Sequence, residues 1–267
     1  MTDMTDTPRQ RLRKDRRQER IVAELRAQPT LRVSELATDL GVSTETIRRD
    51  LDELESRGLI NRTYGGAVRP FGLEPTIAER HRMMVAEREA IATEAARYVN
   101  HSDVLMIGGG ATTVHIGRRL AAEKRDLTII TNAFGVATVL AVNPTFTIFM
   151  CPGRYNAHEG LMAGAATVEY LAGFYANHAI LGATGMTPEG PNEADADAAA
   201  VYRAMMGRSA ETMIVADHTK FDQVSLALYF TWADVTRLVT DRVPTGPLRR
   251  SLDRARVHLA VNGPEPP

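Results

Sequence analysis

Apolar residues in the first quarter of the chain recur at the three- and four-residue intervals of amphipathic helices. The pattern predicts a first helix over residues 14–27, which ends before Pro29, and a short second helix that ends at Gly41. A third helix follows Ser43 and ends near Gly58. The buried stripes of these helices would consist of Ile21, Val22, Leu25, Leu36, Ala37, Leu40, Ile47, Leu51 and Leu54.

The third helix has marked end signals and a polar face. The Ser43 hydroxyl can accept hydrogen bonds from the free amides of the first turn, and Glu45 complements the helix dipole. Gly58 occupies a position where helices often end in a left-handed residue. Four polar residues near the start of this helix lie outside its apolar stripe, at positions where a recognition helix contacts base pairs: Thr44, Thr46, Arg48 and Arg49.

Residues 59–68 predict two short strands that meet near Gly65 and Gly66. A hairpin of this kind after three helices is the wing of a winged helix-turn-helix, so we expect a mainly helical DNA-binding domain over residues 14–69. Residues 1–13 are polar and show no periodicity, which predicts a disordered basic tail. Residues 70–80 contain two prolines and a glycine, the composition of a linker.

Beyond the linker, strand-like and helical patterns alternate. A helix is expected over residues 85–99. Helical patterns also lie between most of the seven expected strands. This alternation predicts a C-terminal α/β domain, residues 81–262, whose mostly parallel sheet is covered on both faces. The expected strands are residues 104–107, 127–131, 146–150, 179–181, 213–216, 238–240 and 257–261.

The charge of the chain is unevenly distributed. The net charge is −1, but residues 1–69 hold 14 Lys and Arg against 12 Asp and Glu. Seven of those basic residues lie between Arg9 and Arg20. Such a run is consistent with a solvated tail and helix face and, equally, with contacts to DNA phosphates beside a helix-turn-helix.

The composition excludes two classes of protein. Hydrophobic residues make up 44% and charged residues 24%, which is ordinary for a soluble globular protein. Cys151 is the only cysteine, so a disulfide framework is excluded and a reducing compartment is expected. Residues 127–153 carry no charge, but Pro144 and several polar residues favour a buried strand–helix–strand unit over a membrane span. We therefore expect a cytoplasmic protein with no membrane partner.

One glycine-rich segment lies between an expected strand and the next helix. Glycines let the backbone approach an anion, and the amides of a helix start, with threonine hydroxyls, can hold a phosphate. The alternative is a tight turn with no ligand. The segment lacks the third glycine of a dinucleotide-binding fingerprint and the Gly-Lys-Ser/Thr end of a nucleotide-triphosphate loop. It consists of Gly108, Gly109, Gly110, Ala111, Thr112 and Thr113.

Other polar residues follow apolar runs, and in parallel α/β sheets ligands bind outside the carboxyl ends of strands. Arg154 can grip a phosphate with two hydrogen bonds, and Lys220 can neutralise one as a point charge. Each of them, taken singly, is as well explained as a surface charge. The set consists of Thr131, Asn132, Arg154, the segment from Gly182 to Gly185, Asp217 and Lys220.

The segment GVSTETIRRDLDELESRGLINRTYGGA resembles the signature of the DeoR family of bacterial transcriptional regulators through nearly its whole length. The resemblance implies a helix-turn-helix over residues 31–50. The residues then expected to contact double-stranded operator DNA are Arg32, Ser43, Thr44, Thr46, Arg48, Arg49, Arg62 and Tyr64.

Residues 75–241 resemble the sensor domain of the same family, through GGGATT, IITNAFGVATVLA, GATGM, RAMM and ADHTKF. The resemblance implies the fold of ribose-5-phosphate isomerase and a phosphorylated sugar or related metabolite as effector. Two positions depart from the family pattern. Gly108 stands where the family usually has an aspartate, and Tyr202 stands where it often has a lysine.

These features favour a transcriptional repressor, and two-fold operators imply a homo-oligomer, either a dimer or a tetramer. One alternative is a sugar-phosphate isomerase carrying a DNA-binding domain, with Asp217 and Lys220 as acid and base. Another is a DNA-binding scaffold without a ligand. The histidines lack metal-binding spacing, so neither a metal nor a cofactor is expected. His218 adjoins Asp217, but a structural role is favoured for it.

Overall fold

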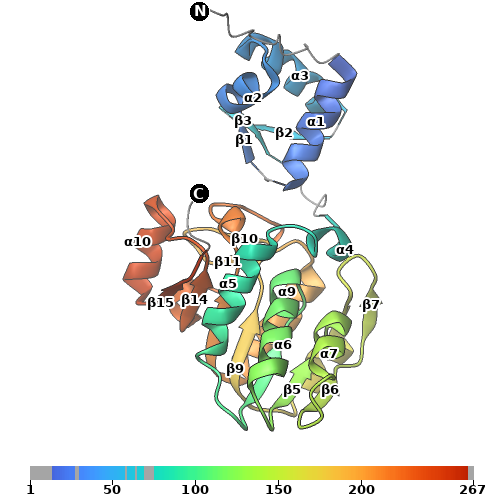
Figure 1. Ribbon diagram of the computed structural model, residues 1–267, viewed down its shortest axis with the longest axis vertical. Helices are drawn as coiled ribbons and strands as arrows, with labels where there is room; N and C mark the ends of the chain where they lie inside the picture. The colour runs from blue at the N-terminus through green and yellow to red at the C-terminus, as the bar shows by residue number, and fades with distance from the viewer. Residues whose placement is uncertain (1–13, 28–29, 58, 64, 69–74, 264–267) are drawn as a thin grey trace, which may run out of the picture. The chain divides into compact units, whose positions relative to one another are not determined.

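The computed structural model describes residues 14–27, 30–57, 59–63, 65–68 and 75–263 (Figure 1). The chain divides into two compact units, Met1–Glu74 and Pro75–Pro267, and each is described here by itself. The expected basic tail, the expected helix end at Gly58 and the expected DNA contact Tyr64 lie outside the described residues.

The first unit contains three helices and a small antiparallel sheet of strand order β1-β3-β2. The three expected helices and both strands of the expected wing are present. The elements are α1 (Lys14–Ala27), β1 (Thr30–Arg32), α2 (Val33–Leu40), α3 (Thr44–Ser56), β2 (Asn61–Thr63) and β3 (Gly66–Val68).

Strand β1 was not expected, because three residues are too few to show a period. It forms by pairing with β3, where Leu31 lies opposite Ala67 and Arg32 lies opposite Gly66. The chain needs a glycine at position 66, since a Cβ there would lie 1.9 Å from the Leu31 carbonyl oxygen. The hairpin is therefore fastened to the segment that leads into α2.

The core of the first unit is the apolar stripe that the sequence predicts. Ile47, Leu51 and Leu54 are buried against α1 and α2. The Ser43 hydroxyl accepts a hydrogen bond from the Thr46 amide at 3.2 Å, as expected for the N-cap of α3. Gly41, with φ of 63°, ends α2 in the left-handed region.

A buried ion pair joins α1 to α3. Arg17 Nε lies 2.5 Å from Asp50 Oδ2, and Arg17 Nη2 lies 3.1 Å from Asp50 Oδ1. Both side chains are almost fully buried. The two-bond geometry suits a guanidinium and a carboxylate, which makes the pair a specific fastening between the helices. The sequence pattern does not predict this pair, because its two partners lie 33 residues apart.

The second unit is built on a seven-stranded parallel sheet of order β15-β14-β12-β9-β4-β5-β6. All seven expected strands are present, so the expected α/β architecture is confirmed. The strands are β4 (Val104–Ile107), β5 (Thr128–Thr131), β6 (Thr147–Met150), β9 (Ala176–Leu181), β12 (Ser209–Val215), β14 (Arg237–Thr240) and β15 (His258–Val261).

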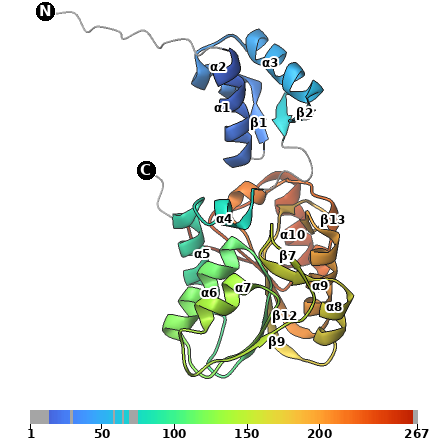
Figure 2. The same cartoon turned by 90° about the vertical axis from the view of Figure 1, so that its right-hand side faces the viewer.

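Helices cover both faces of this sheet. Figure 2 shows α5, α6 and α7 on one side and α8, α9 and α10 on the other. Their apolar faces and the central strands form one continuous core. The helices are α5 (Val85–Ala96), α6 (Ala111–Glu123), α7 (Phe134–Leu140), α8 (Ala165–Leu171), α9 (Ala196–Gly207) and α10 (Gly246–Ala255).

Several short elements at the rim of the sheet were not expected, because each is too short to show a period. They are the hairpin of β7 (Arg154–Asn156) and β8 (Leu161–Ala163), the 3₁₀ turns His218–Lys220 and Trp232–Asp234, and the antiparallel sheet of β10 (Gly185–Met186), β11 (Pro191–Glu193) and β13 (Ala227–Leu228).

The expectation of a linker through residue 80 is wrong at its end. The second unit starts at Pro75, and helix α4 covers Ile77–Arg80. The sequence carried the signal, since Thr76 and Glu79 form a capping box in which each side chain bonds the other residue's backbone amide. The two prolines and the glycine of residues 70–80 favoured a linker instead.

Candidate functional site

The order of the strands places a candidate site between β4 and β9. After β4 the chain forms α6 and then β5, which lies next to β4 in the sheet. After β9 it forms α9 and then β12, which lies next to β9 on the other side of this strand pair. The two adjacent strands therefore send their connections in opposite directions. This is the topological switch point at which open α/β sheets bind ligands.

A small cavity lies at this switch point, among the segments that follow β4, β9 and β12. Its volume is about 40 Å³. Since a single water needs roughly 10–15 Å³ by this measure, there is room for about three waters or one phosphate group. The lining residues are Arg80, Arg88, Gly109, Gly110, Ala111, Thr112, Glu159, Gly182, Ala183, Thr184, Glu193, Tyr202, Val215, Ala216, Asp217 and Lys220.

The N-terminus of α6 forms one wall. Gly110, with φ of 136°, is the N-cap of the helix and has a backbone conformation that other residues rarely adopt. The Thr113 hydroxyl donates to the Gly110 carbonyl at 3.0 Å and fixes the turn. Ala111 and Thr112 follow in the first turn and line the cavity. The free amides and positive dipole end of a 13-residue helix therefore lie at the cavity.

Arg88 brings a buried positive charge to the cavity. Its Nη1 donates to the Met83 carbonyl at 2.6 Å and to the Arg80 carbonyl, and its Nη2 lies 3.5 Å from Asp217 Oδ2. Among the described residues its Nε has no hydrogen-bond partner. Burial lowers the pKa of Arg88, while Asp217 opposes that change. With a single carboxylate against it and an amide-rich helix end nearby, this guanidinium suits an anionic ligand.

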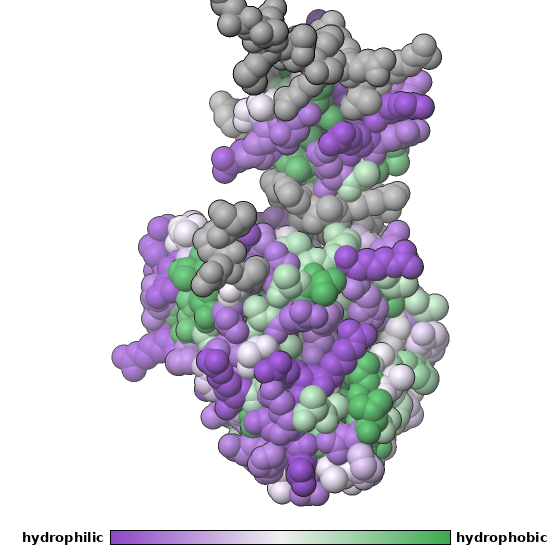
Figure 3. Space-filling model, in the orientation of Figure 1, coloured by the Kyte–Doolittle hydropathy of each residue, from purple (hydrophilic) through white to green (hydrophobic). Residues whose placement is uncertain are grey.

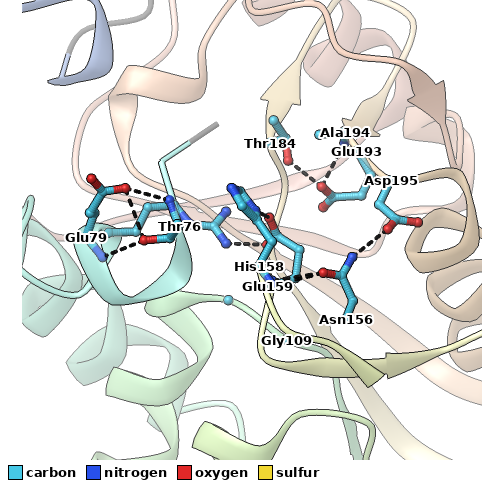
Figure 4. A network of polar contacts seen from close by, with 12 residues as sticks. Thr76, Glu79, Gly109, Asn156, His158, Glu159, Thr184, Glu193, Ala194 and Asp195 are labelled. Atoms are coloured by element: carbon cyan, nitrogen blue, oxygen red, sulfur yellow. Dashed lines mark hydrogen bonds and ion pairs between the residues drawn. The ribbon is translucent and has the colours of Figure 1, made fainter. Parts of the chain in front are cut away.

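Two carboxyl groups line another part of the cavity. Glu193 accepts hydrogen bonds from the Thr184 hydroxyl and, at 2.8 Å, from the Ala194 amide, as Figure 4 shows. Burial raises the pKa of Glu193 to about 7, although both hydrogen bonds oppose the rise. Glu159 forms an ion pair with Arg80. The cavity is thus lined by helix amides, cationic groups and carboxyl groups together.

Tyr202 occupies the space beside Gly108. The Tyr202 hydroxyl donates to the Gly109 carbonyl at 2.9 Å, and its ring packs edge-on against that of Tyr229 at 5.5 Å. A Cβ on Gly108 would lie 2.7 Å from Tyr202 Cε1, a separation that real Cβ atoms essentially never show. The two departures from the family pattern are therefore in contact with each other.

Six of the twelve residues expected to bind the effector line the cavity: Gly109, Gly110, Ala111, Thr112, Asp217 and Lys220. The other six lie outside its lining. Gly108 and Gly185 provide close packing, since a Cβ on Gly185 would lie 2.2 Å from the Gln223 carbonyl oxygen. Arg154 is exposed and pairs with Asp197 at 2.6 Å.

The remaining three expected residues hold backbone around the site. The Thr131 hydroxyl donates to the Ile107 carbonyl at 2.7 Å, which ties β5 to β4. Asn132 Nδ2 donates to the Met162 carbonyl at 2.7 Å and so holds β8. Thr113 fixes the Gly110 turn, as described above. These residues follow strands, as the sequence predicts, but their side chains bond to backbone groups and do not line the cavity.

Sequence reasoning missed Arg80, Arg88, Glu159 and Glu193 as lining residues. Arg88 lies in a helix rich in charge, where one inward arginine resembles its solvated neighbours. Arg80 and Glu159 lie on short elements that the sequence did not predict. His218 is set apart from the cavity, and its Nδ1 lies 2.5 Å from Asp241 Oδ2. Although burial opposes it, this contact lowers the pKa of Asp241, so a structural role fits His218.

On the first unit, α3 presents Arg48 and Arg49 to solvent, with side chains 57% and 79% exposed. Thr44, Ser43 and Arg32 are exposed as well, and Thr46 is half-buried beneath the Ser43 cap. Glu45 lies 3.9 Å from Arg48 and 3.4 Å from Arg49. Arg62 in the wing pairs with Asp52 at 3.3 Å. The exposed positions match those at which a recognition helix contacts DNA.

Two classes of site find no support in the part of the chain that the structure describes. No three His, Cys, Asp or Glu side chains there are grouped so that they could hold a metal ion. No helix within the described ranges is both long and apolar enough to span a bilayer.

Two family models match the chain. Residues 17–70 match a DeoR-like helix-turn-helix domain, and residues 83–242 match the DeoR C-terminal sensor domain. The matched ranges contain α3 and the wing in the first case and the cavity's glycine segment in the second.

Several relatives match this chain over nearly its whole length. The HTH-type transcriptional repressor CsqR of Escherichia coli is 30% identical over 98% of this chain and 97% of its own length. The glycerol-3-phosphate regulon repressor of Escherichia coli is 30% identical over 94% of this chain and all of its own. The HTH-type transcriptional repressor GlcR of Bacillus subtilis is 28% identical over 91% and 96%.

Solved structures with a related arrangement are more distant. Ribose 5-phosphate isomerase A from Methanocaldococcus jannaschii covers 50% of this chain and 53% of its own, with a TM-score of 0.37 and 14% identity. Translation initiation factor eIF-2B from Pyrococcus horikoshii covers 85% and 82%, with a TM-score of 0.45 and 15% identity.

Proposed function

Because the chain belongs to the DeoR family of helix-turn-helix transcriptional regulators, we propose that it represses transcription under the control of a phosphorylated sugar or polyol. The ligand binds in the cavity at the β4–β9 switch point. The observation that carries the proposal is the meeting of the α6 N-terminus, Arg88 and Lys220 around a cavity of phosphate size.

The phosphate group lies against the first turn of α6. The amides there complement a dianion, and Arg88 and Lys220 add two positive charges from other segments. Thr112 supplies a hydroxyl in the same turn. Charge-assisted hydrogen bonds of this kind contribute about 1.5–3 kcal/mol each. The arrangement favours a doubly charged phosphate over a neutral sugar.

Glu193 and Thr184 receive the rest of the ligand. Glu193, with its pKa near 7, and Thr184 offer both donors and acceptors to hydroxyl groups. Two relatives are named for phosphorylated or sugar-type compounds, namely the glycerol-3-phosphate regulon repressor and the lactose phosphotransferase system repressor. Their names support a phosphorylated carbohydrate as the ligand class of this chain.

The first unit binds operator DNA. Arg48 and Arg49 contact bases or phosphates from α3, and Arg62 contacts the backbone from the wing. Two copies of the chain read a two-fold operator, so the protein acts as a dimer or a larger homo-oligomer. The ligand changes operator affinity only to the extent that it binds one arrangement of the oligomer more tightly than another.

The chain acts as a sensor and not as an enzyme. A carboxyl group with a pKa near 7 could serve as a general base, which keeps isomerisation of a sugar phosphate as the second candidate. Incubation of the purified protein with pentose and hexose phosphates decides between them. A sensor leaves each phosphate unchanged, and measurable isomerisation would contradict the proposal.

Calorimetric titration with inorganic phosphate, then with a panel of triose, pentose and hexose phosphates, tests the ligand site. Lys220→Gln is expected to weaken binding by about tenfold to a hundredfold, since it removes a charged partner. Lys124→Gln, at the far end of α6, is the matched control and should leave binding unchanged. Equal binding by wild type and Lys220→Gln would exclude this cavity as the phosphate site.

A further inference from the structure

Helix α4 is the first element after Glu74, where the first unit ends, and it is fastened to the turn between β7 and β8. The Ile77 amide donates to the His158 carbonyl at 3.0 Å. Arg80, at the end of α4, forms an ion pair with Glu159 of that turn. Figure 4 shows the capping box of Thr76 and Glu79 beside His158 and Glu159.

Both members of this ion pair line the cavity, and their side chains are only 12% and 13% exposed. The ion pair that holds α4 to the β7–β8 turn is therefore formed by two residues that line the cavity. A phosphate on the α6 N-terminus would bring a dianion next to a partly buried carboxylate, that of Glu159. It would also offer the Arg80 guanidinium a second, more strongly charged partner.

The rest of the cavity wall has little freedom to move. Gly109 and Gly182 follow central strands of the sheet, Tyr202 is buried and hydrogen-bonded, and Arg88 is buried. The Arg80–Glu159 pair lies instead on a four-residue helix and a hairpin turn outside the main sheet. A ligand larger than a phosphate group therefore gains room most easily at this pair.

We propose that the ligand's phosphate binds Arg80 in place of Glu159, so that α4, at the start of the second unit, is released from the β7–β8 turn. The inference rests on the proposed phosphate site. When Arg80 leaves, Glu159 keeps a contact with His158 Nδ1, at 2.9 Å. The Ile77–His158 hydrogen bond still joins α4 to the turn.

Two variants separate this role from a merely structural ion pair. Glu159→Gln breaks the pair and removes the charge that repels the phosphate, so phosphate should bind about tenfold more tightly. Arg80→Gln breaks the same pair but removes a ligand contact, so phosphate should bind about tenfold more weakly. Glu123→Gln breaks an Arg–Glu pair of α6, at 2.6 Å from Arg119, and is the matched control.

The readout is hydrogen exchange of peptides that cover residues 75–84 in the full chain, with inorganic phosphate as the probe and its binding followed by calorimetry. Phosphate should speed exchange of α4 in wild type several-fold. Both variants of the pair should show the fast exchange without phosphate, and Glu123→Gln should match wild type.

The outcomes distinguish the inference from the function beneath it. Phosphate that binds while α4 exchange stays unchanged or slows would overturn the inference and leave the ligand site intact. Opposite shifts of phosphate affinity in the two variants support it, and equal shifts would overturn it. Absence of any phosphate binding would overturn the proposed site and, with it, the inference.

Discussion

The ring of Tyr202 fills the space that a side chain at Gly108 would need. A Cβ on Gly108 would approach Tyr202 Cε1 to 2.7 Å and Leu181 Cδ2 to 3.0 Å, and the Tyr202 hydroxyl is bound to the Gly109 carbonyl. The tyrosine and the glycine therefore depend on each other. Where an aspartate and a lysine would place two charges, this chain has an aromatic ring held by one hydrogen bond.

Gly108→Ala should destabilise the second unit by about 1–3 kcal/mol, because the new methyl group would force the buried, hydrogen-bonded Tyr202 ring to shift. Urea unfolding followed by circular dichroism measures the change. Gly207→Ala, at the end of α9 where no atom lies within 4 Å of the new methyl group, is the control and should be neutral or slightly stabilising.

The same clash predicts coupling between the two positions. In a Tyr202→Leu background the cost of Gly108→Ala should fall, because the atom that it strikes is gone. The coupling energy should reach about 1–2 kcal/mol, as is usual for residues in contact. Additive effects in the double-mutant cycle would mean that the ring does not set the requirement for glycine.

Glu193 predicts an unusual dependence of stability on pH. Its pKa is about 7 in the folded chain, against 4.5 for the ordinary carboxyl, so between these values the folded state holds a proton that the unfolded state has lost. Stability from this group is fully present below pH 4.5 and is lost as the pH rises toward 7. The loss is on the order of 3 kcal/mol.

Glu193→Gln keeps the shape of the group and removes its titration. Relative to wild type, the variant should therefore lose less stability between pH 4.5 and 7, as measured by urea unfolding at several pH values. Parallel pH profiles for the two proteins would show that Glu193 titrates at its ordinary value. Glu189→Gln, an exposed position before β11, serves as the control.

The Arg17–Asp50 pair predicts that loss of one partner destabilises the first unit more than replacement of both partners. Asp50→Ala should cost about 3–5 kcal/mol, because it leaves a buried guanidinium without its carboxylate. Replacement of both residues by apolar ones of similar size, Arg17→Met with Asp50→Leu, should restore much of that loss. Thermal unfolding of the helical signal measures both. A double variant less stable than Asp50→Ala would contradict this account.

Arg48→Ala should weaken operator binding by about 1–3 kcal/mol at fixed salt if the arginine contacts a base, and should relax sequence preference at that position. Glu45→Gln should have the opposite effect on operator affinity. It removes a negative charge 3.4 Å from Arg49 and should strengthen binding at low salt. Fluorescence anisotropy with a labelled operator measures both. Unchanged affinity of Arg48→Ala would exclude α3 as the recognition helix.

Much of the fold was predictable because its elements are long or strongly patterned. The stripe of Ile47, Leu51 and Leu54 identified α3, and the central strands of the parallel sheet have continuous apolar runs because both of their faces are covered. The elements that escaped prediction, such as β1 and α4, are three or four residues long and depend on partners distant in sequence.

The candidate site was predictable where the backbone defines it and not where side chains do. The glycine segment after β4 was found because helix starts bind anions whatever the side chains. Arg88 and Glu193 escaped, since the inward or outward direction of one charged residue depends on packing that a single sequence does not show. Thr131 and Asn132 illustrate the converse, as polar residues in the right place that bond to backbone.

Hydrophilic residues cover most of the described face of the second unit in Figure 3, with apolar residues among them. Exposed apolar side chains gather on one rim segment near β13, with Val224 and Leu226 each 67% exposed. Adjacent exposed apolar side chains of this kind are typical of surfaces that contact other proteins.

A phosphorylated ligand that controls DNA binding from the switch-point cavity must change operator affinity. Fluorescence anisotropy would measure the Kd of the full chain for a genomic operator at fixed salt, with and without a phosphosugar that calorimetry shows to bind. The phosphosugar should change this Kd by at least about fivefold in wild type and leave it unchanged in Lys220→Gln. An operator Kd that is the same with and without bound ligand, or that changes equally in Lys220→Gln, would contradict it.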